Sequence, residues 1–279
     1  MELYHYLEEV SVEHRNWRTG KRKPDESDWQ DEDGVGIRNE WIKSIDYRAT
    51  VERVTEALNV KAGTPKFSII LATRNRQQML DKAIASVLAQ TRADWELIVI
   101  DNSDERQQIV DDPRIKHHFV ERTNIPDLYN QGLAHAKGEI ICGLADDDLL
   151  PRHALETAGI HLGNADWLVA ATQIRDESGN PVLMRGGTRE SVEQTRRGTY
   201  MLGGAIYWRK SLSDELGGYN EDFDGAGDFD LFTRFLRRSD PVVIPDVLYL
   251  YNDWPGTDSR QRAANQSEKS QRIATQIRR

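Results

Sequence analysis

Three adjacent aspartates, Asp146, Asp147 and Asp148, follow directly on the apolar run 140–145. Carboxylates this close repel one another, so at the mouth of a buried strand they need a cationic partner. Mg²⁺ and similar cations take oxygen ligands, often one or two protein carboxylates together with the phosphates of a substrate. The triplet therefore suggests metal-dependent chemistry on a phosphate ester or a nucleotide-activated donor. A solvated helix start is the alternative, because Pro151 suits a first helical turn and acidic residues are favoured ahead of it.

The segments around the triplet alternate between short apolar runs and amphipathic stretches. The apolar runs predict strands over 67–72, 95–100, 115–120 and 139–144, and the amphipathic stretches predict helices over 77–90 and 127–137. This alternation indicates an α/β fold, a Rossmann-like and mainly parallel sheet covered by helices on both faces. Ligands of such sheets bind beyond the carboxyl ends of the strands. Three polar clusters, 73–75, 101–103 and 146–148, each end a predicted strand, so we expect them to meet at one edge.

The later half of the chain has a more mixed pattern. It predicts a hairpin of strands 167–172 and 181–185, a strand over 203–208, a tight turn at 217–220 and a helix over 228–238. We expect one domain over 65–258, with a nucleotide half (65–150) and an acceptor half (151–258). Residues 1–64 read as an N-terminal extension with an amphipathic helix over 41–58. The basic tail 259–279 could be a helix on the body, a disordered arm or a weak anchor on an anionic surface, and a solvated tail is favoured.

The composition suits a chain with one sizeable core, since 38% of its 279 residues are hydrophobic. A formal net charge of −9 argues against nonspecific nucleic-acid binding by the whole protein. Cys142 is the single cysteine, which excludes an intramolecular disulfide and fits a reducing compartment. No basic region followed by an apolar one begins the chain, and the apolar runs are too short to span a membrane. We therefore expect a soluble, cytoplasmic protein.

Dinucleotide-binding, phosphate-loop, calcium-loop, zinc and Gly-x-Ser-x-Gly hydrolase patterns are all absent from the sequence. What remains is a set of motifs in a fixed order: 67–76, 96–103, 130–141 and the aspartate triplet. This order resembles the nucleotide-sugar half of family 2 glycosyltransferases of the GT-A fold. The later segments 217–221 and 227–231 resemble the acceptor-side signature of that family, and the resemblance runs from about Lys66 to Asn252.

The resemblance implies a set of contacts with a nucleotide-diphospho-sugar. These contacts would come from Thr73, Arg74, Asn75, Asp101, Asn130 and Asp146. Within this set Asp101 would hydrogen-bond the nucleobase. The alternative role for Asp101 is that of a turn residue that caps the end of the strand. Asp147 and Asp148 would hold Mg²⁺ or Mn²⁺, with Asp147 as principal ligand. Ala145 stands where the first acid of the family motif usually lies, so which two of the three aspartates act stays open.

The resemblance also assigns Asp228 as the catalytic base that takes the acceptor proton. Gly227 replaces the acid that usually precedes this base, and a helix N-cap is the alternative role of Asp228. Trp208, Asp230 and Tyr251 are assigned to the acceptor side, where aromatic rings can stack on sugars. Asp230 also suits the first turn of a helix without any contact with a ligand.

The function implied is an inverting transfer of a sugar from a nucleotide-diphospho-sugar, a UDP-sugar by default, to a hydroxyl group. The expected acceptor is a glycan or a lipid-linked glycan, and a hydroxylated nucleic-acid base is a minor possibility. The sequence is also compatible with a sugar nucleotidyltransferase on a similar sheet, or with an inactive sugar-binding module. Specificity is expected in the loops 176–197 and 251–260. Donor sugar, linkage and oligomeric state are open.

Overall fold

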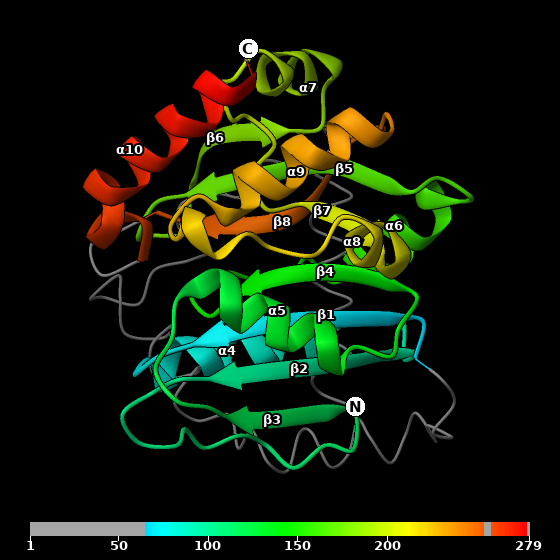
Figure 1. Cartoon of the computed structure of the whole chain (residues 1–279). Helices are drawn as coiled ribbons and strands as arrows, with labels where there is room; N and C mark the ends of the chain where they lie inside the picture. Colours follow the sequence, from blue (N-terminus) through cyan, green and yellow to red (C-terminus); the bar gives the residue numbers. More distant parts are fainter. Residues whose placement is uncertain (1–64, 254–257, 278–279) are drawn as a thin grey trace, which may run out of the picture. The chain divides into compact units, whose positions relative to one another are not determined.

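Eight strands form one mixed sheet in the part of the chain that the computed structural model describes, residues 65–253 and 258–277 (Figure 1). The strand order is β3-β2-β1-β4-β7-β5-β6, and β8 pairs with β5 beside this path. The predicted N-terminal extension and its helix over 41–58 lie outside the described residues. The sheet confirms the predicted α/β class, with a parallel half followed by a mixed half.

The parallel half consists of β1 (Phe67–Thr73), β2 (Trp95–Asp101), β3 (Ile115–Phe119) and β4 (Ile140–Ala145). The helices α4 (Gln77–Leu88), α5 (Ile125–His135) and α6 (Ala154–Leu162) connect or follow these strands. Side chains alternate between the two faces of a strand. Ile69 of β1 therefore packs with α4 and α6, while Ile70 packs with α5 on the other face. Helices on both faces explain why β1, β2 and β4 are largely apolar and buried, whereas β3 at the edge of the sheet carries Lys116, His117 and His118.

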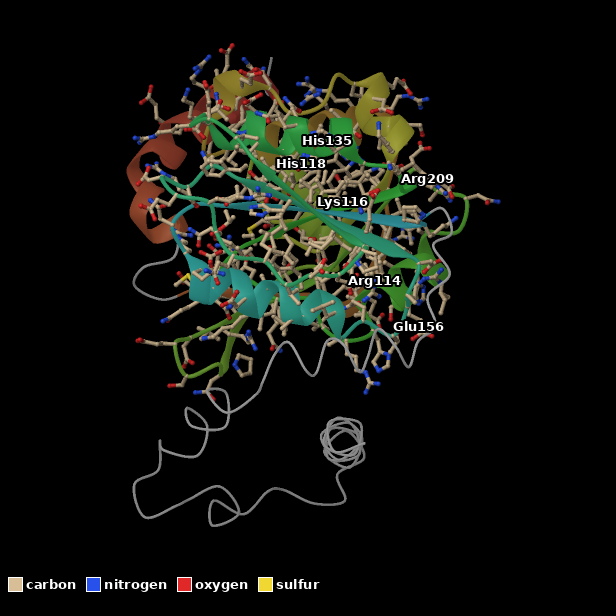
Figure 2. All side chains as sticks on the ribbon, turned by 90° about the horizontal axis from the view of Figure 1, so that it is seen from below. Arg114, Lys116, His118, His135, Glu156 and Arg209 are labelled. Carbon is tan, nitrogen blue, oxygen red and sulfur yellow. The ribbon has the colours of Figure 1, made fainter. Side chains whose placement is uncertain are left out.

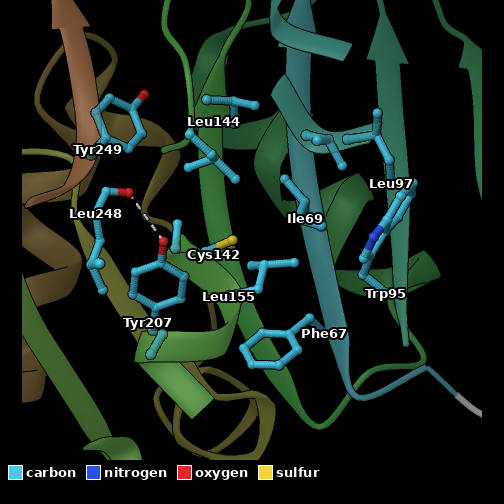
Figure 3. Close-up of a cluster of buried hydrophobic side chains, with 14 of the residues drawn as sticks. Phe67, Ile69, Trp95, Leu97, Cys142, Leu144, Leu155, Tyr207, Leu248 and Tyr249 are labelled. Carbon is cyan, nitrogen blue, oxygen red and sulfur yellow. Dashed lines mark hydrogen bonds between the residues drawn. The ribbon is translucent and has the colours of Figure 1, made fainter. Parts of the chain in front are cut away.

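Figure 3 shows the core on the α4 and α6 side of the sheet, where Phe67 and Ile69 meet Leu144 and Leu155. Cys142 lies within this cluster with 1% of its surface exposed, which confirms that it is a core residue. Burial raises the pKa of its thiol far above the ordinary value, so the thiol stays protonated and inert.

The mixed half contains β5 (Trp167–Arg175), β6 (Pro181–Gly186), β7 (Ile206–Arg209) and β8 (Val242–Asn252). Its helices are α7 (Arg189–Arg196), α8 (Lys210–Glu215) and α9 (Gly227–Arg238), and a 3₁₀ turn covers Glu221–Phe223. β7 runs antiparallel to β4 and β5, β6 antiparallel to β5, and β8 parallel to β5. The predicted hairpin, formed by β5 and β6, and the helix over 228–238 are confirmed.

Two expected loops contain regular structure. In the segment 176–197, residues 189–196 form α7 after the confirmed strand β6, and residues 251–252 of the segment 251–260 belong to β8. The tail is not simply solvated, because α10 covers Asp258–Ile277. Ile273 of α10 is buried with Phe223 and Phe229 beside α9, and Lys269 donates to the Asp222 carbonyl at 2.6 Å. Within the described residues no helix is both long and apolar enough to cross a membrane.

Candidate active site

The three polar clusters predicted to meet do lie at one edge of the sheet. The register places Thr73 beside Asp101 and Ala72 beside Ala145, so β1, β2 and β4 end level with one another. The Thr73 hydroxyl donates to Asp146 Oδ2 at 2.8 Å, which joins the first cluster to the aspartate triplet. Parallel strand ends thus bring together residues that lie 73 positions apart.

The turn after β1 is fixed by its own polar side chains. Asn75 has a φ of +55°, a left-handed conformation that asparagine tolerates better than most residues. Its Nδ2 donates to Asp104 Oδ2 at 2.7 Å, and the Asp104 amide donates back to Asn75 Oδ1 at 3.0 Å. Arg74 reaches the same Asp104 carboxylate at 3.4 Å. Arg74 and Asn75 therefore tie two strand-end loops together at the position predicted for the nucleotide.

Arg76 is a site residue that the sequence interpretation missed. Its Nη1 lies 3.2 Å from Asp146 Oδ1 and 3.2 Å from Asp147 Oδ2, so one guanidinium bridges two aspartates. Burial and the neighbouring Asp147 raise the pKa of Asp146 to about 6, and Arg76 and Thr73 act in the opposite direction. The repulsion expected within the triplet is thus offset by an arginine from the turn after β1. The only signal for it in the sequence is that this turn carries a second arginine.

Asp148 serves a different purpose from its two neighbours. Its Oδ2 accepts from the Tyr249 hydroxyl and its Oδ1 from the Asn252 amide, both at 2.8 Å. The Tyr249 oxygen also accepts from the Ala145 amide at 3.1 Å, so the end of β8 holds both sides of the acidic turn. Both carboxylate oxygens are thus bonded within the chain, and the role of Asp148 as a metal ligand stays a prediction. Asp148 anchors the turn that presents Asp147.

Asp101 is fully buried and shapes the loop after β2. Its Oδ1 accepts from the Ser103 amide at 3.0 Å, and its Oδ2 accepts from the Gln107 amide at 2.8 Å. His117 Nε2 lies 3.0 Å from the same Oδ2. Burial alone would raise the pKa of Asp101, but these hydrogen bonds outweigh it and lower the pKa. The geometry favours the turn role over a contact with a nucleobase.

Asn130 is bonded to the backbone of a distant turn, and its place beside the nucleotide stays a prediction. Its Nδ2 donates to the Tyr219 carbonyl at 2.9 Å, and its Oδ1 accepts from the Tyr219 amide at 2.8 Å. This pair joins α5 to the turn before α9. A side chain at Gly218, which has a φ of +69°, would meet Asn130 Oδ1 at 2.6 Å. Asn130 and this glycine are therefore explained by packing.

A cavity of about 290 Å³ opens beside the acidic turn. Asp147, Asp148 and Asp228 line it together with the predicted acceptor-side residues Trp208 and Tyr251. Further lining comes from tyrosines and one arginine: Tyr129, Tyr200, Tyr219, Tyr249 and Arg185. Aromatic rings with hydroxyl groups suit a sugar, which has apolar faces and polar edges.

Asp228 lies in the first turn of α9 and lines the same cavity. The helix begins at Gly227 with Ala226 at the cap position, so the N-cap role for Asp228 is wrong. Its Oδ1 accepts from the Phe229 amide at 2.8 Å, and burial raises the pKa of its carboxyl. A Cβ at Gly227 would lie 3.2 Å from Pro126 and 3.3 Å from Tyr219. This close packing accounts for a glycine where the family motif usually carries an acid.

Asp230 and Trp208, two of the residues predicted on the acceptor side, differ in their relation to the cavity. Asp230 does not line the cavity, because its carboxylate faces Arg234, whose Nη2 lies 2.7 Å from Asp230 Oδ2. Arg234 also donates to the carbonyls of Leu216 and Gly218, so the ion pair stabilises the turn before α9, and these contacts favour the alternative of a helix first-turn acid for Asp230. Trp208 is a core residue with 1% exposure, yet it lines the cavity, and its indole nitrogen has no hydrogen-bond partner among the described residues.

The donor set fits a hard divalent cation held partly by its substrate. No three His, Cys, Asp or Glu side chains within residues 65–253 and 268–277 form a group that could hold a metal. Asp146 and Asp147 nevertheless converge on one cationic nitrogen, and Mg²⁺ commonly uses one or two protein carboxylates with phosphate oxygens completing its shell. Asp147 lines the cavity and shares Arg76 with Asp146, whereas both carboxylate oxygens of Asp148 accept hydrogen bonds from β8.

Known proteins share this architecture. S. aureus TarS in complex with UDP-GlcNAc matches with a TM-score of 0.60 at 16% identity, over 75% of this chain and 66% of that chain. A mannosyltransferase from Pyrobaculum calidifontis, in complex with GDP-Man and Mn²⁺, matches with a TM-score of 0.54 at 17% identity, over 82% of this chain and 72% of that chain. At these identities the likeness establishes the GT-A fold.

The sequence itself matches known relatives. A Campylobacter jejuni GalNAc(5)-diNAcBac-PP-undecaprenol beta-1,3-glucosyltransferase is 40% identical over 102 residues, 33% of this chain and 33% of the relative. The chain spans only 29% to 33% of the length of this and similar relatives. The model of the family "Glycosyl transferase family 2" matches residues 68–239, which is more than half of the chain. With the strand-end cluster and the cavity described above, the match shows that this chain belongs to glycosyl transferase family 2.

Proposed function

We propose that this protein is an inverting, metal-dependent glycosyltransferase that uses a nucleotide-diphospho-sugar, by default a UDP-sugar. The observation that supports this most is the shared cavity, which Asp147 and Asp228 both line. One carboxylate belongs to the strand-end cluster of the parallel half, and the other lies in the first turn of α9 in the mixed half. A donor bound at the first and an acceptor held near the second would place the anomeric carbon between them.

Asp228 is proposed as the base. An acceptor hydroxyl attacks poorly until a carboxylate within about 3 Å accepts its proton. Burial raises the pKa of Asp228, and a carboxylate with a raised pKa is a stronger base. Attack and departure must occur on opposite sides of the anomeric carbon, which inverts its configuration.

The departing diphosphate is proposed to lie at the acidic turn. Asp147, with Asp146 as second ligand, would hold Mg²⁺ or Mn²⁺, which neutralises the charge that builds on the leaving oxygen. Thr73, Arg74 and Arg76 border the same cluster and would face the nucleotide. Asp148, Tyr249 and Asn252 would keep the turn in place without touching the donor.

The acceptor is proposed to be a glycan or a lipid-linked glycan. The catalytic domain is proposed to extend over residues 65–258, and the protein is proposed to be cytoplasmic. The Campylobacter relative, whose name includes PP-undecaprenol, supports a lipid-linked acceptor. A nucleotidyltransferase is less well supported, because the turn 73–76 has no glycines with which to cradle a triphosphate. An inactive binding module is less well supported too, since the proposed base and metal ligand share one cavity.

A thermal-shift screen of UDP-, GDP- and dTDP-sugars, with Mn²⁺ or with EDTA, tests this function. We expect one donor to raise the melting temperature with Mn²⁺ and to give a much smaller shift with EDTA. Release of a nucleoside diphosphate on adding an acceptor would separate transfer from binding. Release of pyrophosphate would contradict the proposal in favour of a nucleotidyltransferase. An unchanged melting temperature with every donor would contradict it in favour of an inactive module.

A further inference from the structure

Two side chains in the wall of the cavity interact with each other, the phenol of Tyr200 and the carboxylate of Asp228. The Tyr200 hydroxyl hydrogen-bonds Asp228, and the same hydroxyl donates to the Gly203 carbonyl at 3.0 Å. A phenol carries one hydroxyl proton, so it donates fully to only one of these two acceptors at a time. The other hydrogen bonds of the Asp228 carboxylate come from backbone amides, those of Phe229 and of Asp228 itself. Within the part of the chain that the structure describes, Tyr200 is therefore the side chain whose hydrogen bond can follow the charge of Asp228.

The fold holds both the backbone and the ring of Tyr200 in place. The amide of the next residue, Met201, donates to the Thr195 hydroxyl of α7 at 3.0 Å. The Met201 carbonyl accepts from the Gly186 amide of β6 at 2.8 Å. The Tyr200 ring packs on Phe229 of α9, with ring centroids 5.3 Å apart. Three elements thus fix this residue, and its hydroxyl is the part that can still turn.

The surroundings of Asp228 make this hydroxyl important for its charge. No lysine or arginine in the described residues forms an ion pair with Asp228. The ionisable side chains around it are the phenols of Tyr129, Tyr200 and Tyr219, and Arg185 lies on the far side of Tyr200 as its electrostatic partner. Burial raises the pKa of Asp228, whereas its hydrogen bonds lower it. The Tyr200 hydroxyl therefore offsets part of the cost of a charge on Asp228.

We propose that Tyr200 positions the base, donating its hydroxyl to the Asp228 carboxylate before transfer and turning to the Gly203 carbonyl once that carboxylate is protonated. This inference rests on the proposed function and adds a positioning residue to it. In the transfer the acceptor O–H bond breaks as the acceptor oxygen bonds the anomeric carbon, and its proton goes to Asp228. The electron pair of the broken C–O bond leaves with the diphosphate. Protonated Asp228 then donates to the Tyr200 oxygen, which keeps its own proton throughout.

The pH dependence of kcat in Tyr200→Phe tests this role. Phe keeps the ring beside Phe229 but donates no hydrogen bond to the ionised carboxylate, so the pKa of Asp228 should rise. Because the base acts only when ionised, the acidic limb of the kcat profile should move up by about one pH unit, with kcat about 10-fold lower below the limb.

Tyr219→Phe is the matched control for this profile. Tyr219 lines the same cavity and interacts with the charge of Asp228, but no hydrogen bond joins the two side chains in the described structure. Whatever its effect on the rate, its acidic limb should lie where that of the wild type does. An unmoved limb in Tyr200→Phe, or equal shifts in the two variants, would overturn the inference.

Urea unfolding gives a second readout that needs no substrate. The loss of stability in Tyr200→Phe should grow as the pH rises through the pKa of Asp228, because only the ionised carboxylate uses the hydroxyl. In an Asp228→Asn background the same substitution should have the same effect at every pH. A loss independent of pH with Asp228 present would overturn the inference and leave Tyr200 as a packing residue. If the pH-dependent loss were present but wild-type protein transferred no sugar, the proposed function would fail while the pairing of Tyr200 with Asp228 stood.

Discussion

A single amide substitution separates the chemistry of Asp228 from its place in the fold. Asn keeps the shape of the side chain but cannot accept a proton, so Asp228→Asn should lower kcat by about 10²- to 10⁴-fold. Donor affinity should stay at the wild-type level, because the donor is proposed to bind at the acidic turn. Steady-state release of the nucleoside diphosphate and donor titration measure the two effects. Transfer at the wild-type rate would show that another group is the base.

Tyr249 is expected to control the acidic turn through one hydroxyl. Tyr249→Phe removes the donor to Asp148 and the acceptor for the Ala145 amide, which leaves buried polar groups without partners. Such a loss costs about 1–3 kcal/mol, and part of it should appear as weaker Mn²⁺-dependent nucleotide binding. Tyr207→Phe is the control, because the Tyr207 hydroxyl donates to the Leu248 carbonyl within the core (Figure 3). If both variants changed nucleotide binding equally, Tyr249 would have no specific role at the site.

At the scale of the elements, a contact between β3 and α5 should make the fold sensitive to acid. His118 and His135 stack with ring centroids 3.8 Å apart, and both are marked in Figure 2. Burial, with His135 and His117 nearby, lowers the pKa of His118 below its ordinary value of 6.5. A lowered histidine pKa means that the folded state binds fewer protons than the unfolded one. Stability is therefore complete above pH 6.5 and falls as the pH drops from 6.5 through the folded pKa.

His135→Gln should weaken this dependence, because it removes one of the charges that lower the pKa of His118. Urea unfolding at several pH values between about 5 and 8 measures the slope. His161→Gln is the control, since His161 is exposed at the end of α6. An unchanged slope in His135→Gln would contradict the role of the stacked pair.

The elements differ in how readily the sequence predicts them. β1, β2 and β4 are continuous apolar runs that end in polar clusters, so their type, order and convergence could all be predicted. β8 was missed because Pro245 and Asp246 interrupt its apolar pattern, and its register beside β5 shifts as well. α7 was missed because Val192 is its only large apolar residue, and it depends on Thr188, which caps the helix by accepting from the Ser191 amide at 3.1 Å.

The residues of the site also differ in how far the sequence predicts their roles. The family pattern located Asp147 and Asp228, and the structure brings both to one cavity. The family pattern could not distinguish Asp148 from its neighbours. The carboxylate of Asp148 accepts hydrogen bonds from Tyr249 and Asn252, which lie more than 100 positions away in the sequence. The bond of Asn130 to the backbone of a distant turn could not be predicted for a related reason, since its partner Tyr219 lies 89 positions away. Motif order predicts which loops meet, whereas tertiary hydrogen bonds decide what each side chain does there.

For the molecule as a whole, α10 should stabilise the helix that carries Asp228. Ile273 has 2% of its surface exposed and packs with Phe223 and Phe229 beside α9. Ile273→Ala should therefore destabilise the fold by about 2–5 kcal/mol. Ile160→Ala on α6 is the control, because Ile160 is 69% exposed and should change stability by less than about 0.5 kcal/mol. Equal effects in urea unfolding would mean that α10 contributes nothing to the core.

The acidic turn is proposed to bind a nucleotide through a divalent metal. Calorimetric titration of UDP, or of the diphosphate that the donor screen selects, into wild-type protein and into Asp147→Asn tests it most directly. We predict that Mn²⁺ tightens binding to the wild type by about 10-fold or more over EDTA, and that Asp147→Asn shows no such gain. Equal affinity with Mn²⁺ and with EDTA in the wild type, or an undiminished gain in Asp147→Asn, would contradict the account.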